Sequence, residues 1–172
     1  MDVYETVEGG RTALEKLTDI IPGWKGYQER QTRRKADKTM REMLADKIAT
    51  QRKRLDTAQQ SLIDSGKIDL VDDLGRAVTQ LQTFADRVRL ATYGYSGVFD
   101  AVKIKQEQLE QLYNFDAALF DYVDRLNTAN DRLREAIDAG QGVEETIRII
   151  QDMCREANAA FDEREHVLLG SQ

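Results

Sequence analysis

Apolar side chains recur every three or four residues along most of the chain, which is the period of an α-helix with one buried face. This pattern predicts one short helix over residues 12–20 and four long helices over about 27–64, 69–93, 98–139 and 143–168. Thr12 and Glu15 form a capping-box pair at the start of the first helix. The breaks contain Pro22, Gly66 and Gly140, residue types that interrupt helices. An all-α fold is therefore expected.

The helix expected over residues 98–139 has the longest apolar repeat. Its steps of three and four residues alternate over five heptads, which is typical of a left-handed coiled coil. The repeat positions are Val102, Lys105, Leu109, Leu112, Asp116, Leu119, Val123, Leu126, Asn130, Leu133 and Ile137. Because short loops favour antiparallel neighbours, we expect an elongated antiparallel four-helix bundle with coiled-coil character plus a short N-terminal helix, in a single domain spanning residues 1–172.

Three polar residues occupy positions where this repeat requires apolar side chains: Lys105, Asp116 and Asn130. A buried charge needs a partner or must change its protonation. We expect all three to be buried and structural, fixing the register of the helices, in preference to a catalytic or metal role. Asp116 is expected to pair with an Arg or Lys of the helix over 27–64.

Length and composition narrow the functional classes. The chain has 172 residues, a net charge of −6 and a single cysteine. No run approaches the roughly 18 apolar residues of a membrane span. The acidic start lacks the basic and apolar regions of a secretory signal, so we expect a cytoplasmic protein, with peripheral association with a membrane left open.

Residues with catalytic or metal-binding chemistry are sparse. His166 is the only histidine, Cys154 lies on an apolar stripe, and the glycines match no phosphate-binding loop. We therefore expect no enzyme, no cofactor, no metal and no small-molecule substrate. The alternative is a carboxylate-based metal-binding bundle. It would use residues such as Glu107, Glu110, Asp121 and Asp124.

The most distinctive segment begins at Pro22. Between Lys25 and Arg54 there are eleven Lys or Arg residues against four Asp or Glu. Such asymmetry can mark a surface for an anionic partner, or can simply be a solvated helix face. A protein partner, including a second copy of the chain, is the first expectation; an anionic membrane surface comes next and nucleic acid last. The residues expected to bind a partner here are Trp24, Tyr27, Arg30, Arg33, Arg34, Lys38 and Arg41.

A second candidate surface lies at residues 93–97, YGYSG, between two of the long helices. Its glycines predict either a turn or a kink in a continuous helix. The aromatic side chains that can pack this corner or contact a partner are Tyr93, Tyr95 and Phe99.

Two stretches carry a resemblance. They are IPGWKGYQERQTRRKADKTMRE (21–42) and YGYSGVFDAVKIKQEQLEQLYNFDAALFDYVDRL (93–126). They resemble a family of uncharacterised prokaryotic all-helical coiled-coil proteins that begin IPGYxGYxxRxxRRxADK, with Trp24 standing where the family has tyrosine. This family is associated with SPFH (stomatin/prohibitin-type) proteins and with proteins like phage shock protein A. The resemblance implies a helical scaffold or adaptor with a role in membrane stress.

Overall fold

The computed structural model describes residues 12–91 and 106–169, and within these ranges every regular element is a helix. The predicted all-α class is therefore confirmed for the described residues. The elements are α1 (Ala13–Ile20), α2 (Arg33–Asp64), the 3₁₀-helix η2 (Ile68–Leu70), α3 (Val71–Leu90), α5 (Gln106–Ala139) and α6 (Val143–Leu169).

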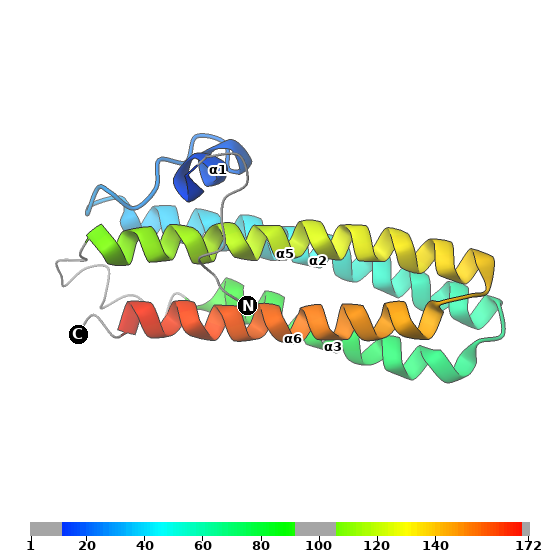
Figure 1. Cartoon of the computed structure of the whole chain (residues 1–172). Coiled ribbons are helices and arrows are strands. Elements are labelled where there is room, and N and C mark those ends of the chain that lie inside the picture. The colour runs from blue at the N-terminus through cyan, green and yellow to red at the C-terminus, as the bar shows by residue number, and fades with distance from the viewer. Residues whose placement is uncertain (1–11, 92–105, 170–172) are drawn as a thin grey trace.

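Four long helices lie side by side (Figure 1). In this view α2 and α5 run from left to right, and α3 and α6 return. Helices α2 and α6 each pack against both α3 and α5, so α2 and α6 are diagonal to one another. The 34 residues of α5 span about 51 Å, which sets the long dimension of the molecule.

The core follows the apolar repeat. In the described part of α5, the repeat positions from Leu109 to Ile137 are all buried, including Asp116 and Asn130. Matching stripes of α2, α3 and α6 complete one continuous core. Hydrophobic burial on one face of each helix therefore holds the four helices together.

Helix α1 is attached to the outside of α5 at one end of the molecule (Figure 1). The predicted capping box is confirmed: Thr12 Oγ1 accepts a hydrogen bond from the Glu15 N–H at 3.2 Å, and Glu15 Oε2 accepts one from the Thr12 N–H at 3.3 Å. Leu17 is fully buried, and Lys16 forms an ion pair with Asp121 of α5. Apolar packing together with this ion pair thus holds α1 in place.

Helix α2 begins at Arg33, six residues later than the apolar pattern predicted. Gly26 has a φ of +80°, a left-handed conformation that favours glycine and is incompatible with a helix. Tyr27 then donates its backbone N–H to the Tyr113 hydroxyl of α5 at 2.8 Å, and its carbonyl accepts a hydrogen bond from Arg33 Nε at 2.6 Å. These tertiary hydrogen bonds take the place of helical ones.

The remaining boundaries differ from the prediction by smaller amounts. The helix expected over 69–93 is divided into η2 and α3, and α3 ends at Leu90. The last long helix ends at Leu169, and its start at Val143 is as predicted. The predicted start of the helix over 98–139 and the alternative of a turn or a kink at 93–97 lie outside the described residues.

Candidate functional site

The residues expected to form one basic partner-binding surface are divided between the interior and the exterior. Arg30, Arg34 and Lys38 are exposed. The other four are buried, with exposed fractions of 6% for Trp24, 0% for Tyr27, 8% for Arg33 and 0% for Arg41. As folded, the chain cannot present those four to a partner, and the expected surface must be reduced to its exposed members.

Trp24 and Tyr27 are buried because the chain folds back onto α5 after Pro22. The Tyr27 ring stacks on Tyr113 with a centroid distance of 5.3 Å, and the Trp24 ring meets both tyrosines edge-on. Trp24 Nε1 donates to the Ala36 carbonyl of α2 at 2.8 Å. The three rings form an aromatic cluster, defined here as Trp24, Tyr27 and Tyr113, which fixes the corner between α1 and α2.

Beneath the aromatic cluster lies a network of buried charges. Asp116 of α5 accepts hydrogen bonds from Arg164 Nε at 2.6 Å and from the Tyr27 hydroxyl at 2.5 Å. Arg164, which belongs to α6, also donates from Nη2 to Asp37 Oδ1 at 2.8 Å. The partner expected for Asp116 was an Arg or Lys of α2; that expectation was wrong, because the arginine comes from α6.

Arg41 completes the charge network on the side of α3. It donates from Nε to Asp37 Oδ2 at 2.8 Å, and from Nη1 to the carbonyls of Val88 and Arg89 at 3.1 and 3.0 Å. These carbonyls belong to the last turn of α3, where helical partners are lacking. A cation there also interacts favourably with the helix dipole. We call Asp37, Arg41, Asp116 and Arg164 the charge network.

Burial and charge pairing act in opposite directions on the pKa of Asp116 in the charge network. Burial raises the pKa of Asp116, and the charge of Arg164 opposes that shift. Burial, reinforced by the charge of Asp116, raises the pKa of Tyr27 well above the usual value, so the phenol stays protonated and donates. Each of the four carboxylate oxygens of Asp37 and Asp116 accepts a hydrogen bond from an arginine or a tyrosine. Both carboxylates are thus held in place by buried hydrogen bonds.

Three members of the charge network, Asp37, Arg41 and Arg164, were not predicted as buried. The i,i+4 pair of Asp37 and Arg41 is the pattern of a solvated helix, and it gives no sign of burial on its own. Arg164 follows Phe161 by three residues and precedes Leu168 by four. It therefore occupies a position of the apolar stripe, and this spacing was the available signal.

Asn130 lies further along α5 and is 5% exposed. Its Nδ2 donates to Gln51 Oε1 of α2 at 2.9 Å, a pairing that links two neighbouring helices. The other candidates, Lys105, Tyr93, Tyr95 and Phe99, lie outside the described residues.

The exposed cations gather around the start of α2. We call Lys25, Arg30, Arg34, Lys35 and Lys38 the basic surface; all five side chains are exposed. The first turn of α2 contains no acidic residue, and its N-cap Thr32 makes no capping hydrogen bond with its side chain. Helix N-termini are positive, so arginine and lysine side chains there interact unfavourably with the helix dipole.

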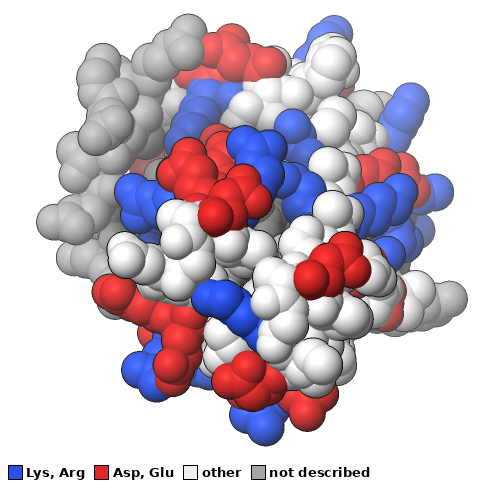
Figure 2. Space-filling model, turned by 90° about the vertical axis from the view of Figure 1, so that its right-hand side faces the viewer, with Lys and Arg blue, Asp and Glu red and all other residues white. Residues whose placement is uncertain are grey.

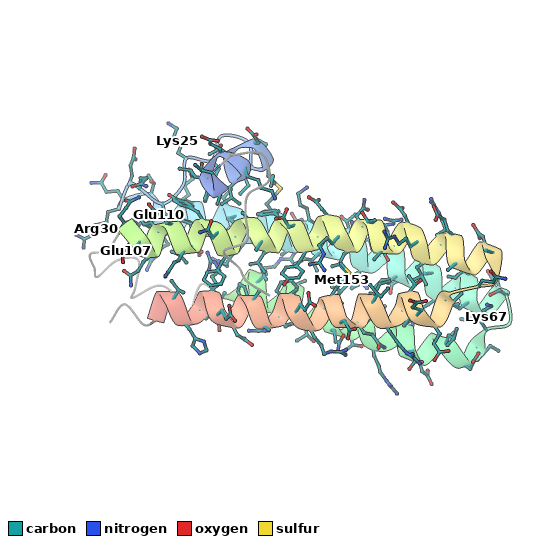
Figure 3. All side chains as sticks on the ribbon, in the orientation of Figure 1. Lys25, Arg30, Lys67, Glu107, Glu110 and Met153 are labelled. Carbon is teal, nitrogen blue, oxygen red and sulfur yellow. The ribbon has the colours of Figure 1, made fainter. Side chains whose placement is uncertain are left out.

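The end of the molecule opposite the basic surface carries charges of both signs. Figure 2 shows Lys and Arg interspersed with Asp and Glu over that end. In Figure 3, Lys25 and Arg30 lie at the left-hand end, together with Glu107 and Glu110 on the first turns of α5, whereas Lys67 marks the mixed-charge end. The basic surface therefore lies at the same end of the molecule as two exposed carboxylates, Glu107 and Glu110.

The carboxylates considered for a metal do not form a cluster. Glu107, Glu110 and Asp124 are exposed, and Asp121 is paired with Lys16. Among residues 12–91 and 106–169, no group of three His, Cys, Asp or Glu side chains is placed to hold a metal ion. Burial raises the pKa of the Cys154 thiol to about 12, which keeps it protonated at neutral pH.

The described helices also bear on the membrane question. None of them combines the length and the apolar character that crossing a bilayer requires.

Comparison with known proteins returns no relative. No protein-family model, no curated protein and no solved structure matches this chain.

Proposed function

We propose that this protein is a non-enzymatic helical scaffold or adaptor whose basic surface binds an acidic protein partner. In this proposal the chain is an elongated four-helix bundle with coiled-coil character, in which α2 with α3 and α5 with α6 form the antiparallel pairs. The role in membrane stress implied by the resemblance of residues 21–42 and 93–126 belongs to the same proposal. The protein acts in the cytoplasm, where it meets its partner.

The observation that carries the proposal is the set of exposed cations at the start of α2. The first three residues of α2 are Arg33, Arg34 and Lys35, and they lie at the positive end of the helix dipole. Arg33 is turned inward to the Tyr27 carbonyl, whereas Arg34 and Lys35 face solvent. An acidic partner would offset the repulsion between these groups and steer its own approach to this end.

The interior supports a structural role over a catalytic one. The charge network is closed to solvent, and its carboxylate oxygens are occupied by hydrogen bonds. Cys154 is fully buried. A substrate would have no route to these groups without opening the core.

An anionic membrane surface is the second candidate for the basic surface. The same cations favour it, because lysine and arginine near a surface attract anionic lipids. Trp24 and Tyr27 are buried, however, so the described part of this end offers neither of these rings for insertion between headgroups. Binding to a membrane would therefore rest on charge alone, and salt would weaken it.

The test compares proteins that co-purify with the tagged full-length chain from its native cells. The variant Arg34→Glu/Lys35→Glu/Lys38→Glu reverses three exposed charges of the basic surface. The matched control Lys47→Glu/Lys53→Glu/Arg132→Glu reverses three exposed charges elsewhere. We expect one acidic protein to be lost with the first variant and retained with the control.

The partner must then bind when purified, because capture from cells includes indirect contacts. We expect the affinity for the first variant to fall by about tenfold or more, and the affinity for the control to stay unchanged. Loss of binding with both variants would mean that net charge alone is responsible. Co-sedimentation with vesicles of phosphatidylserine and phosphatidylcholine at two salt concentrations tests the membrane candidate.

A further inference from the structure

A groove of about 190 Å³ lies between α2 and α5, in the half of the molecule away from the aromatic cluster. Its lining includes Arg54, Ala58 and Ser61 of α2 and Asn130, Arg134 and Asp138 of α5. A water molecule takes up about 30 Å³ of the liquid, and pockets for drug-sized ligands start at about 300 Å³. The groove therefore suits a molecule of only a few heavy atoms.

A chain of hydrogen bonds fixes the orientation of the amides beside this groove. The Arg54 guanidinium can only donate, so the oxygen of Asn127 must face it, and the two lie 2.6 Å apart. Gln51 Nε2 donates to the same Asn127 oxygen at 3.2 Å. The oxygen of Gln51 is thereby turned towards Asn130, whose Nδ2 donates to it at 2.9 Å. The donor character of Arg54 thus decides the orientation of all three amides.

The end of this chain is a buried acceptor. Asn130 is 5% exposed, and its Oδ1 has no hydrogen-bond partner among the described residues. Because Asn130 Nδ2 donates to Gln51, a flip that exchanged the oxygen and nitrogen of the Asn130 amide would break this hydrogen bond. A buried acceptor without a donor is destabilising. Asn130 is one of the residues that line the groove.

The groove also offers a cation. Arg134 is exposed, and within residues 12–91 and 106–169 it forms no ion pair. Arg54, in contrast, is held by Asn127 and by Asp131 at 2.6 Å. An arginine fork binds a carboxylate through two parallel hydrogen bonds. Asp138, at the same groove, favours a ligand that also carries a positive or donor group.

We propose that this groove binds a small molecule with a carboxylate beside an amino or hydroxyl group. The amino or hydroxyl group donates to Asn130 Oδ1, and the carboxylate pairs with Arg134. Asn130 Oδ1 is itself buried, so binding includes a shift of side chains that line the groove. The groove is thus a second binding site, independent of the basic surface.

The experiment is an NMR titration of the full-length chain that follows the side-chain amide of Asn130. Three probes are compared: glycine, which has an amino donor; glycolate, which has a hydroxyl donor; and acetate, which has neither. We expect saturable shifts of the Asn130 amide with glycine or glycolate, and binding of acetate weaker by about tenfold or more, because a site built for a donor rejects the analogue that lacks it.

Two variants test whether the carboxylate of the ligand binds to Arg134. Arg134→Gln removes the groove cation, and Arg132→Gln removes an exposed arginine of α5 that does not line this groove. The first should weaken binding by about tenfold, and the second should leave it unchanged. Saturation by glycine alone assigns an amino ligand, and saturation by glycolate alone assigns a hydroxyl ligand. The proposal is overturned if acetate binds as well as both, if no probe saturates, or if the two variants weaken binding equally.

Discussion

Arg164 of α6 donates a hydrogen bond to Asp37 of α2 at 2.8 Å, although these two helices lie diagonally across the bundle. Through Asp116 the same arginine reaches α5, and through Arg41 the carboxylate of Asp37 is connected to the last carbonyls of α3. All four long helices are thus joined at one level. A shift of any helix by one turn would leave a buried charge without its partner.

This arrangement predicts the effect of removing Arg164. The variant Arg164→Met keeps most of the side-chain volume but leaves Asp116 buried without its arginine. We expect the free energy of unfolding to fall by about 3–5 kcal/mol, because an unpaired buried charge is strongly destabilising. Urea denaturation followed by circular dichroism measures it.

The control for this variant is Arg155→Met, which removes an exposed arginine of the same helix. Its unfolding free energy should stay within about 0.5 kcal/mol of the unaltered chain. The double variant Asp116→Leu/Arg164→Met should recover part of the loss, since the unpaired carboxylate is gone as well. A loss below about 1 kcal/mol for Arg164→Met alone would mean that the charge network contributes little.

Gly26 allows the corner to approach α5 closely. A Cβ at this residue would lie 2.6 Å from the Tyr113 hydroxyl oxygen and 2.9 Å from Leu14 Cδ1. Gly26→Ala should therefore displace Tyr113, whose hydroxyl holds the Tyr27 N–H.

Gly23 provides a matched comparison for Gly26. Its φ of +72° is similar, but a Cβ there would meet no atom within 4 Å. Gly23→Ala should cost only the left-handed strain of about 1–2 kcal/mol. Gly26→Ala should cost about 1–3 kcal/mol more, because of the overpacking. Equal thermal unfolding midpoints for the two variants would argue against a tight contact at Tyr113.

Because Tyr27 is buried, we expect the folded chain to lose stability at alkaline pH. Burial raises the pKa of Tyr27, so the folded chain holds the phenolic proton more tightly than the unfolded chain does. Its contribution to stability is complete below the unfolded pKa of about 10 and is lost as the pH rises towards the folded pKa. In that range each such phenol lowers the unfolding free energy by about 1.4 kcal/mol per pH unit.

The variant Tyr27→Phe tests the alkaline effect. Urea denaturation between about pH 9 and 11 should show a shallower pH dependence for this variant. Burial also raises the pKa values of Tyr113 and Tyr122, so part of the dependence should remain. Identical slopes for the variant and the unaltered chain would show that Tyr27 ionises equally easily in both states.

The Cys154 thiol is expected not to react with thiol reagents while the chain is folded. It is fully buried, and its pKa is raised to about 12, so the reactive thiolate is absent at neutral pH. A disulfide reagent should modify it only when the chain opens, at a rate that rises with urea. In the comparison variant Cys154→Ala/Ala159→Cys the thiol sits at an exposed position of α6 and should react at once. Rapid modification of native Cys154 would contradict its burial.

The segment that carries the family resemblance also has an internal role. Tyr27, Arg33 and Asp37 lie within residues 21–42, and all three are buried. The Tyr27 hydroxyl donates to Asp116 of α5, and Arg33 donates to the Tyr27 carbonyl. Asp37 accepts a hydrogen bond from Arg164 of α6. These residues need no partner molecule to explain them. The remaining exposed cations, such as Arg34 and Lys38, are those that the scaffold hypothesis requires.

The sequence by itself determined the helices, their approximate ends and the buried stripes. These features depend on local periodicity, on capping residues such as Thr12 and on the breaks at Pro22 and Gly140, all of which can be read along the chain. The repeat of α5 also marked Asp116 and Asn130 as polar residues at core positions. Local spacing could go no further than this.

The tertiary structure decided which polar groups meet. Asp116 pairs with Arg164 from 48 residues away, and the Tyr27 side chain is turned inward because α5 offers Asp116 as the acceptor for its hydroxyl. A charge on a helix has the same local sequence pattern whether it faces water or an opposite charge of another helix. Only packing, which removes water and supplies the partner, separated the buried Arg41 from the exposed Arg34.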